Sequence, residues 1–169
     1  MMENWDLLDR DRRTLGRTVM RGEWIEDGCY HLVVAICVVN EKGQMLLTFR
    51  DPAKKVFPCC WENPGGAAQA GDSSRGAACR ELKEETGLTA GEDDLVLLDS
   101  IWSRSAVLDV YLWQPKGEVG PIVLQPGETC DWKWADLKEL DRMLEDGEIA
   151  ASIVPNMRRI WDKLKAVMR

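Results

Sequence analysis

The sequence has little of what several classes of functional site require. It holds one histidine, His31, among 169 residues, which argues against a histidine-rich zinc site and against a histidine-centred catalytic triad. Its six cysteines show no paired spacing of metal ligands. The net charge is −7, whereas nucleic acids and anionic membranes attract basic surfaces. We therefore expect no zinc cluster, no nucleic-acid partner and no membrane partner.

Long apolar runs are also missing. No segment approaches the roughly 20 apolar residues that a membrane-spanning helix needs. The first residues, Met1–Asp6, lack the basic start and apolar segment of a signal peptide. With 45% hydrophobic and 30% charged residues, the composition is that of an ordinary globular protein. We expect a single domain over residues 1–169, located in the cytoplasm with reduced thiols.

One stretch, Gly65–Leu88, dominates what is present. Its centre, Ser74–Thr86, reads as a helix, because Ser73 or Ser74 can cap the first free N–H groups. Gly87 can adopt the left-handed turn that ends a helix. The stretch therefore predicts a glycine-rich turn that leads directly into a capped helix.

Three carboxylates share one face of this helix. Glu81, Glu84 and Glu85 are spaced three and four residues apart or adjacent, so they repel one another. Mg²⁺ prefers oxygen ligands and would offset that repulsion. A solvated acidic face is the alternative interpretation. The glycine-rich turn before the helix favours the metal site, because it brings backbone groups close to whatever the carboxylates hold.

The spacing of the fixed residues resembles the signature of the Nudix hydrolases. Gly66 is followed after five residues by Asp72 and after seven more by Arg80-Glu81-Leu82-Lys83-Glu84-Glu85-Thr86-Gly87-Leu88. Every fixed position of the family pattern is met except one, where Asp72 replaces glutamate. The shorter side chain at this position should weaken a supporting contact without abolishing activity.

The resemblance implies a fold and a chemistry. The expected fold is an α/β/α sandwich of class α/β, with a mixed sheet between helices. The expected reaction is Mg²⁺- or Mn²⁺-dependent hydrolysis of a diphosphate linked to another group, by water attack on phosphorus. By the resemblance, Glu81, Glu84 and Glu85 are metal-binding and catalytic carboxylates. The carbonyl of Gly66, or of Gly65, is a further ligand, and Arg80 holds Glu81 and the loop in place.

Other candidates lie outside the signature. In many Nudix enzymes an acid from another loop acts as the base or as an extra ligand, and Glu128 and Asp131 are the matching acids, with surface charge as the alternative. Arg50, at the end of an expected strand, is the candidate for substrate binding. Trp61 and Trp102 either stack on a base or belong to the core.

Three functions are compatible with this pattern. A nucleoside diphosphate or its derivative is the first expected substrate, and a non-nucleotide diphosphate such as an isoprenoid diphosphate is the second. The opening segment is similar to a branch related to the isopentenyl-diphosphate isomerases, but Gly65 stands near the place of their cysteine and only His31 remains. Hydrolysis is therefore preferred over isomerisation. A Nudix-fold binding module without catalysis is the third alternative.

The remaining chain predicts the elements around this site. Residues 1–30 contain an expected hairpin, and Leu32–Val39 is a buried strand with Met45–Phe49 as its hairpin partner. Two more strands are expected at Leu95–Trp102 and Ala106–Trp113. Amphipathic helices are expected at Asp136–Glu145 and Ser152–Met168. The terminal helix packs on the sheet or on a second subunit, which leaves a homodimer open.

Overall fold

The computed structural model describes residues 3–169. Its strands are β1 (Asn4–Leu8), β2 (Thr14–Met20), β3 (His31–Val38), β4 (Met45–Arg50), β5 (Trp61–Glu62), β6 (Gly65–Ala67), β7 (Val96–Trp102), β8 (Ala106–Trp113) and β9 (Thr129–Ala135). Its helices are α1 (Ser74–Thr86), α2 (Leu137–Glu145), α3 (Val154–Arg159) and α4 (Trp161–Val167), with a short 3₁₀ helix at Glu92–Asp94. No helix among these residues is long and apolar enough to cross a bilayer.

The central sheet has the strand order β6-β3-β8-β7 and is mixed. β3 and β8 run parallel, with Val34 opposite Asp109, whereas β6 and β7 run antiparallel to their neighbours. A second, antiparallel sheet has the order β5-β4-β9. The predicted α/β class with a mixed sheet between helices is confirmed, although the strands divide into two sheets and a separate hairpin.

The predicted hairpin between the third and fourth strands is wrong. β3 and β4 join only through an isolated bridge between Val39 and Met45. Both edges of β3 are already paired, one with β8 and the other with β6. β4 therefore leaves the central sheet after the turn and pairs with β5 and β9.

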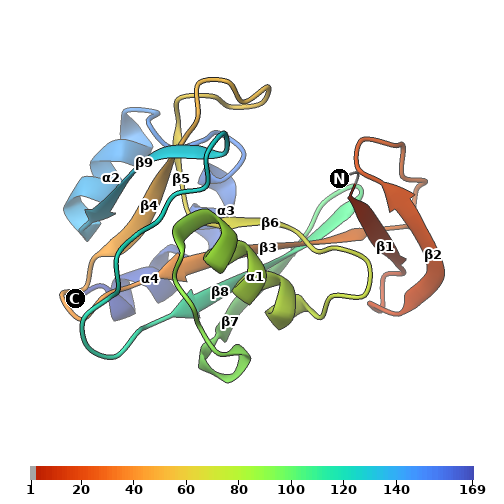
Figure 1. Ribbon diagram of the computed structural model, residues 1–169, viewed down its shortest axis with the longest axis horizontal. Helices are drawn as coiled ribbons and strands as arrows, with labels where there is room; N and C mark the ends of the chain where they lie inside the picture. The colour runs from red at the N-terminus through yellow and green to blue at the C-terminus, as the bar shows by residue number, and fades with distance from the viewer. Residues whose placement is uncertain (1–2) are drawn as a thin grey trace.

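The core lies on both faces of β3, whose side chains alternate between them. Leu32, Val34 and Ile36 pack on the α1 side, together with Ala77, Ala78 and Leu82 of the helix. Cys37, by contrast, packs with side chains of α2, α3 and α4. In Figure 1, α1 lies in front of the central sheet and α3 and α4 lie behind it. This layering sets α1 and its acidic residues against the edge strand β6.

The C-terminal segment differs from the single helix expected over Ser152–Met168. It forms α3 and α4, separated at Ile160, whose φ of −98° and ψ of 6° depart from helical values. Met157, Ile160 and Leu164 are all at most 2% exposed. The break thus allows both short helices to bury their apolar side chains against the sheet of the same chain.

The N-terminal strands β1 and β2 form the expected antiparallel hairpin, with Trp5 opposite Val19. Arg12, in the turn, reaches Asp109 on β8 with Nη1–Oδ1 and Nη2–Oδ2 distances of 2.7 and 2.5 Å. Asp109 is 1% exposed and also accepts hydrogen bonds from the hydroxyls of Ser74 and Ser100. This network ties the hairpin to the first turn of α1.

Candidate active site

The site begins where β6 meets α1. α1 starts after Ser73, whose hydroxyl accepts a hydrogen bond from the backbone N–H of Gly76, and ends at Gly87 with φ of 73°. Both caps were predicted, Ser73 as one of two alternatives. The two glycines of β6 allow close approach: a Cβ on Gly65 would lie 2.3 Å from the carbonyl oxygen of Val34. A Cβ on Gly66 would lie 2.6 Å from the carboxyl carbon of Glu81.

Arg80 connects several parts of the site. Its Nη1 lies 2.8 Å from Glu81 and 3.3 Å from Glu84, and its Nη2 donates to the carbonyl of Ala67 at 3.2 Å. Its Nε and Nη2 donate to Asp72 at 3.2 and 3.0 Å. Asp72, the residue that departs from the signature, therefore contacts Arg80. The guanidinium holds the helix against the strand β6.

Glu85 has the strongest electrostatic perturbation in the site. It is 8% exposed, and burial, followed by the charge of Glu62, raises its pKa well above the ordinary value. Its Oε2 accepts a hydrogen bond from the N–H of Gly65 at 3.1 Å, which opposes the rise, while the charges of Glu81 and Glu128 add to it. Negative charge therefore accumulates around Glu85.

The three carboxylates of α1 have different environments. Burial raises the pKa of Glu81, and the charge of Arg80 opposes that rise. Glu84 is exposed. Within residues 3–169 it forms one ion pair, with Arg80. The helix thus presents one buried, one half-buried and one exposed carboxylate toward the same side.

Sequence reasoning missed Glu62, on β5. Burial raises its pKa against the opposing charge of Arg50, and Arg50 Nη1 lies 2.5 Å from its Oε1. Arg50 also donates to the carbonyls of Phe57 and Val56 at 2.9 and 2.8 Å. Its guanidinium is thus occupied within the chain, and substrate contact by Arg50 stays a prediction. The sequence offered one signal for Glu62: it lies four residues before Gly66, close to the start of the signature.

The two acids outside the signature lie differently. Glu128 forms an ion pair with Lys54, and its charge contributes to the raised pKa values of both Glu85 and Glu62. Asp131, on β9, is exposed and accepts a hydrogen bond from the N–H of Trp132 at 2.7 Å. The structure therefore brings Glu128, and not Asp131, into the electrostatic neighbourhood of Glu85.

The donor chemistry fits a hard divalent cation. Among residues 3–169, no group of three or more His, Cys, Asp or Glu side chains is arranged to hold a metal ion. Glu81 and Glu85 instead contact Arg80 and the Gly65 N–H. Buried carboxylates that lie close together repel one another, and this repulsion raises their pKa values. A divalent cation that takes oxygen ligands would offset the repulsion. The carboxylates of Glu81, Glu84 and Glu85 with the Gly66 carbonyl match that preference.

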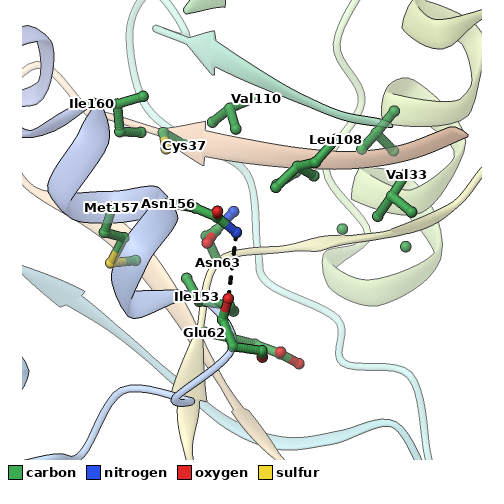
Figure 2. Close-up of a pocket in the computed structure, with 15 residues that line it drawn as sticks. Val33, Cys37, Glu62, Asn63, Leu108, Val110, Ile153, Asn156, Met157 and Ile160 are labelled. Atoms are coloured by element: carbon green, nitrogen blue, oxygen red, sulfur yellow. Dashed lines mark hydrogen bonds between the residues drawn. The ribbon is translucent and has the colours of Figure 1, made fainter. Parts of the chain in front are cut away.

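A cavity of about 240 Å³ adjoins the carboxylates. It lies between the central sheet and α3 (Figure 2), and we name it the β3–α3 cavity. Most of its walls are aliphatic, with Val33, Leu108, Val110, Ile153 and Met157 among them. Its polar lining residues are Glu62, Asn63, Ser152 and Asn156, together with Gly65 and Gly66.

Trp61 and Trp102 do not line this cavity. Trp61 packs against Phe49 with a centroid distance of 4.9 Å and lies 4.5 Å from Lys133 Nζ. Trp102 contacts Tyr30 and Arg10. Asn63 and Asn156 were missed by sequence reasoning. Asn63 directly precedes the Pro-Gly-Gly turn, whereas Asn156 lies in a segment that displayed only an amphipathic pattern.

Comparisons with known proteins identify the family of the chain. The NUDIX domain model matches residues 30–157. An uncharacterized Nudix hydrolase of Listeria innocua is 34% identical over 148 residues, which cover 87% of this chain and 88% of the relative. An isopentenyl-diphosphate Delta-isomerase of Paenarthrobacter aurescens is 29% identical over 76% of this chain and 73% of its own.

A solved structure shows the same fold. The crystal structure of a Deinococcus radiodurans protein superimposes with a TM-score of 0.75 at 23% identity, over 94% of this chain and 99% of the other. The family model covers most of the chain, and the signature residues converge at the junction of β6 and α1. The chain belongs to the Nudix hydrolase family.

Proposed function

We propose that the protein is a Mg²⁺- or Mn²⁺-dependent pyrophosphohydrolase. It cleaves the diphosphate linkage of a nucleoside diphosphate, or of a derivative, by water attack on phosphorus. The observation that carries this proposal is the accumulation of negative charge around Glu85, beside the backbone of Gly65. Burying an ionised carboxylate is costly unless a cation lies beside it, and strongly perturbed carboxylates gather at functional sites.

The residues proposed to hold the cation are Glu81, Glu84 and Glu85, with the Gly66 carbonyl. When bound, a divalent cation neutralises phosphate oxygens and lowers the pKa of a water. Arg80 positions Glu81 through the 2.8 Å contact. These residues fix the carboxylate oxygens on one rigid helix, which reduces the reorganisation needed during the reaction.

The proposed base is Glu128, which accepts the proton of the attacking water. Its charge acts on Glu85 and Glu62, and Lys54 orients its carboxylate through the ion pair. Asp131 is retained as the second candidate for the base. Arg50 is the proposed substrate contact because a guanidinium suits phosphate oxygens, and binding would require it to exchange its contact with Glu62 for one with the substrate.

A second candidate substrate is a non-nucleotide diphosphate, such as an isoprenoid diphosphate. The aliphatic walls of the β3–α3 cavity favour it, since an apolar group gains free energy on leaving water. For either substrate we propose a single Nudix domain over residues 1–169, with the hairpin as an extension. All six cysteines are free, which supports a reducing, cytoplasmic location. We also propose homodimerisation through the N-terminal hairpin and the C-terminal helical segment.

The test is Mg²⁺-dependent cleavage of nucleoside di- and triphosphates, nucleotide sugars, dinucleoside polyphosphates and isoprenoid diphosphates, with the phosphorylated products separated and identified by chromatography. Glu85→Gln should lower kcat by at least about 100-fold, and EDTA should abolish turnover until Mg²⁺ is restored. Lys83→Gln, at an exposed position on the same helix, is the matched control and should keep its activity. Metal-independent turnover, or full activity in Glu85→Gln, would contradict the proposal.

The same variant gives a second readout without turnover. Burial and neighbouring charges raise the pKa of Glu85, so its ionised form destabilises the folded state increasingly as the pH rises above the unfolded pKa. Glu85→Gln should therefore raise the melting temperature of the metal-free protein at pH 7. Added Mg²⁺ should stabilise the wild type more than the variant, and equal stabilisation would argue against a cation at Glu85.

A further inference from the structure

The turn that precedes α1 depends on acceptors from another part of the chain. Residues 69–72 form a β-turn in which the N–H of Asp72 donates to the carbonyl of Gln69 at 3.0 Å. Gly71 has a φ of 90°, as the third residue of a type II turn does. The N–H of Gln69 donates to the Asp72 carboxylate at 3.0 Å. The N–H groups of Ala70 and Gly71 therefore need acceptors outside the turn.

The N-terminal hairpin supplies both acceptors. The carbonyl of Asn4 accepts a hydrogen bond from the N–H of Ala70 at 2.8 Å. The carboxylate of Asp6, on β1, accepts one from the N–H of Gly71 at 2.7 Å. In Figure 1 the segment between β6 and α1 extends toward β1. The hairpin precedes residue 30, at which the match to the family model begins. A segment outside the family model thus holds a turn of the signature.

Asp72 connects this turn to the carboxylates of α1. Its Oδ2 lies 3.2 Å from Nε and 3.0 Å from Nη2 of Arg80, and Nη1 of Arg80 lies 2.8 Å from Glu81. An aspartate has one methylene fewer than the glutamate of the family signature, so it reaches Arg80 only when its backbone lies closer. The contact with Arg80 is therefore more sensitive to the position of the turn than a glutamate would make it.

We propose that Asp6 is a positioning residue for the cation site. The hydrogen bond that it accepts from Gly71 fixes the turn, and the fixed turn holds Asp72 on Arg80. The hairpin thereby compensates for the shorter side chain at the signature position. Asp6 lies outside the proposed set of cation ligands and acts on Glu81 through these contacts. The cation itself rests on the proposed function, whereas the contact between the hairpin and the turn does not.

The hairpin is also attached at the start of α1. The hydroxyl of Ser74 donates to Asp109, which binds Arg12 of the hairpin turn. Asp72 and Ser73, the N-cap of α1, thus lie between two points at which the hairpin contacts the signature. The Arg12 attachment persists when the contact with the turn alone is removed. The hairpin should therefore stay in place, and a variant of the turn contact reports on the turn.

The first experiment measures the turn in the metal-free protein. Amide hydrogen exchange of the full-length protein in EDTA, followed by NMR, should show a protected N–H at Gly71. Asp6→Ala removes the acceptor and should speed exchange at Gly71 by about 10-fold or more. Asp6→Asn keeps an acceptor oxygen and should retain the protection. An unprotected Gly71 in the wild type would overturn the proposal. If Asp6→Ala does not fold, Asp6→Val replaces it, because valine favours strands and has no acceptor.

The second experiment measures cation affinity without turnover. Mn²⁺ is titrated into the metal-free full-length protein, and the free ion is measured by electron paramagnetic resonance. Asp6→Ala should weaken binding by about 10- to 100-fold, as the loss of a residue that orients a metal ligand does. Asp6→Asn removes the charge but should retain most of the affinity. Equal affinity in Asp6→Ala and the wild type would overturn the proposal.

Asp11→Ala is the matched control for this experiment. It removes a carboxylate from the same hairpin, at a side chain that is 70% exposed and pairs with Arg13. Asp11→Ala should bind Mn²⁺ as the wild type does. Equal losses in Asp6→Ala and Asp11→Ala would assign the effect to the charge of the hairpin and would contradict a role for the hydrogen bond.

The third experiment tests the connection through Asp72. Asp72→Glu restores the glutamate of the signature, whose longer side chain reaches Arg80 from a turn that has moved. Combined with Asp6→Ala, it should therefore recover most of the lost Mn²⁺ affinity, whereas alone it should give no gain. A general loss of stability would not be corrected in this way. The same effect of Asp72→Glu in both backgrounds would contradict the proposed connection.

The outcomes separate this inference from the proposed hydrolysis. Mn²⁺ binding that depends on Asp6, in a protein that cleaves no diphosphate, would support the positioning role and contradict the pyrophosphohydrolase. Metal-dependent cleavage with kcat and Mn²⁺ affinity unchanged in Asp6→Ala would do the reverse. A wild type that binds no Mn²⁺ would overturn both, even with a protected N–H at Gly71.

Discussion

Gly66 and Glu81 are in contact across the junction of β6 and α1. A Cβ at Gly66 would lie 2.6 Å from the carboxyl carbon of Glu81, and the two carboxylate oxygens would lie 2.6 and 2.8 Å away. The same α1 residue holds Arg80 at 2.8 Å. Because Gly66 has no side chain, the Glu81 carboxylate can occupy the space where a Cβ would lie. This steric requirement explains why the signature contains both residues.

Gly66→Ala should reduce activity while the fold persists. The added methyl meets the end of a flexible side chain, so Glu81 can move away at little cost to stability. A displacement of about 1 Å at a catalytic group can lower the rate by about 100-fold. Steady-state kcat and the melting temperature, measured on the same preparation, check both parts of the prediction.

Gly65→Ala is the matched comparison. Its methyl would lie 2.3 Å from the Val34 carbonyl oxygen and 2.9 Å from the Cα of Ala35, and neither backbone atom can move without disturbing the central sheet. We expect a loss of about 2 kcal/mol or more in the free energy of unfolding. Equal stability losses in both glycine variants would contradict the steric explanation.

Glu128→Gln should slow the reaction far more than Asp131→Asn. Glu128 acts electrostatically on Glu85 and Glu62, whereas Asp131 is exposed on β9. Removal of a general base typically costs about 10²- to 10⁴-fold in rate. The check is kcat for both variants with the same diphosphate substrate, and a larger loss in Asp131→Asn would transfer the role to that residue.

Arg12→Met should destabilise the protein by leaving Asp109 without its cation. Burial would raise the pKa of Asp109, but the hydrogen bonds from Arg12, Ser100 and Ser74 hold it below the ordinary value. Breaking a fully buried pair costs about 3–5 kcal/mol. The Arg12 side chain is 35% exposed, so we expect about 2 kcal/mol, because solvent screens the pair.

A double-mutant cycle checks this pair. Asp109→Asn alone and combined with Arg12→Met should show a coupling free energy above about 1 kcal/mol in urea unfolding. Additive losses would mean that the two charges do not stabilise each other.

The stability of the protein should fall below neutral pH because of His31. Burial lowers the pKa of His31 from 6.5 to about 4, its Nδ1 is buried without a hydrogen-bond partner, and its ring stacks on Trp5 at 4.1 Å. The unfolded chain binds a proton below about pH 6.5 and the folded chain does not. This contribution is therefore complete above that pH and is lost as the pH falls toward 4.

His31→Phe keeps a ring for stacking and removes the titration. Between pH 7 and pH 5 the wild type should lose about 1–2 kcal/mol more of its free energy of unfolding than the variant. Urea unfolding at both pH values measures this difference. Parallel losses in the two proteins would show that other groups govern the acid sensitivity.

The sequence predicted the central helix to the residue. Ser73, Gly87 and the apolar residues that face the sheet act within a few positions of one another, so the caps and the helical period are local properties. Glu81, Glu84 and Glu85 follow from the same period. Strand pairing was harder to predict from the sequence. β6 and β8, which lie far from β3 in the sequence, pair with the two edges of β3 and leave none for β4.

The family, the α/β class and the set of carboxylates on one helix could be predicted from the sequence alone, because they depend on residue types at fixed short spacings. Only the tertiary structure decided that Glu62 and Glu128 act on Glu85, and that Arg50 is occupied by Glu62. It also brought Asn63 and Asn156, 93 positions apart in the sequence numbering, to one cavity. Packing of distant segments sets burial and Coulombic interactions, and these decide which polar groups are left with unused charge or hydrogen-bonding capacity.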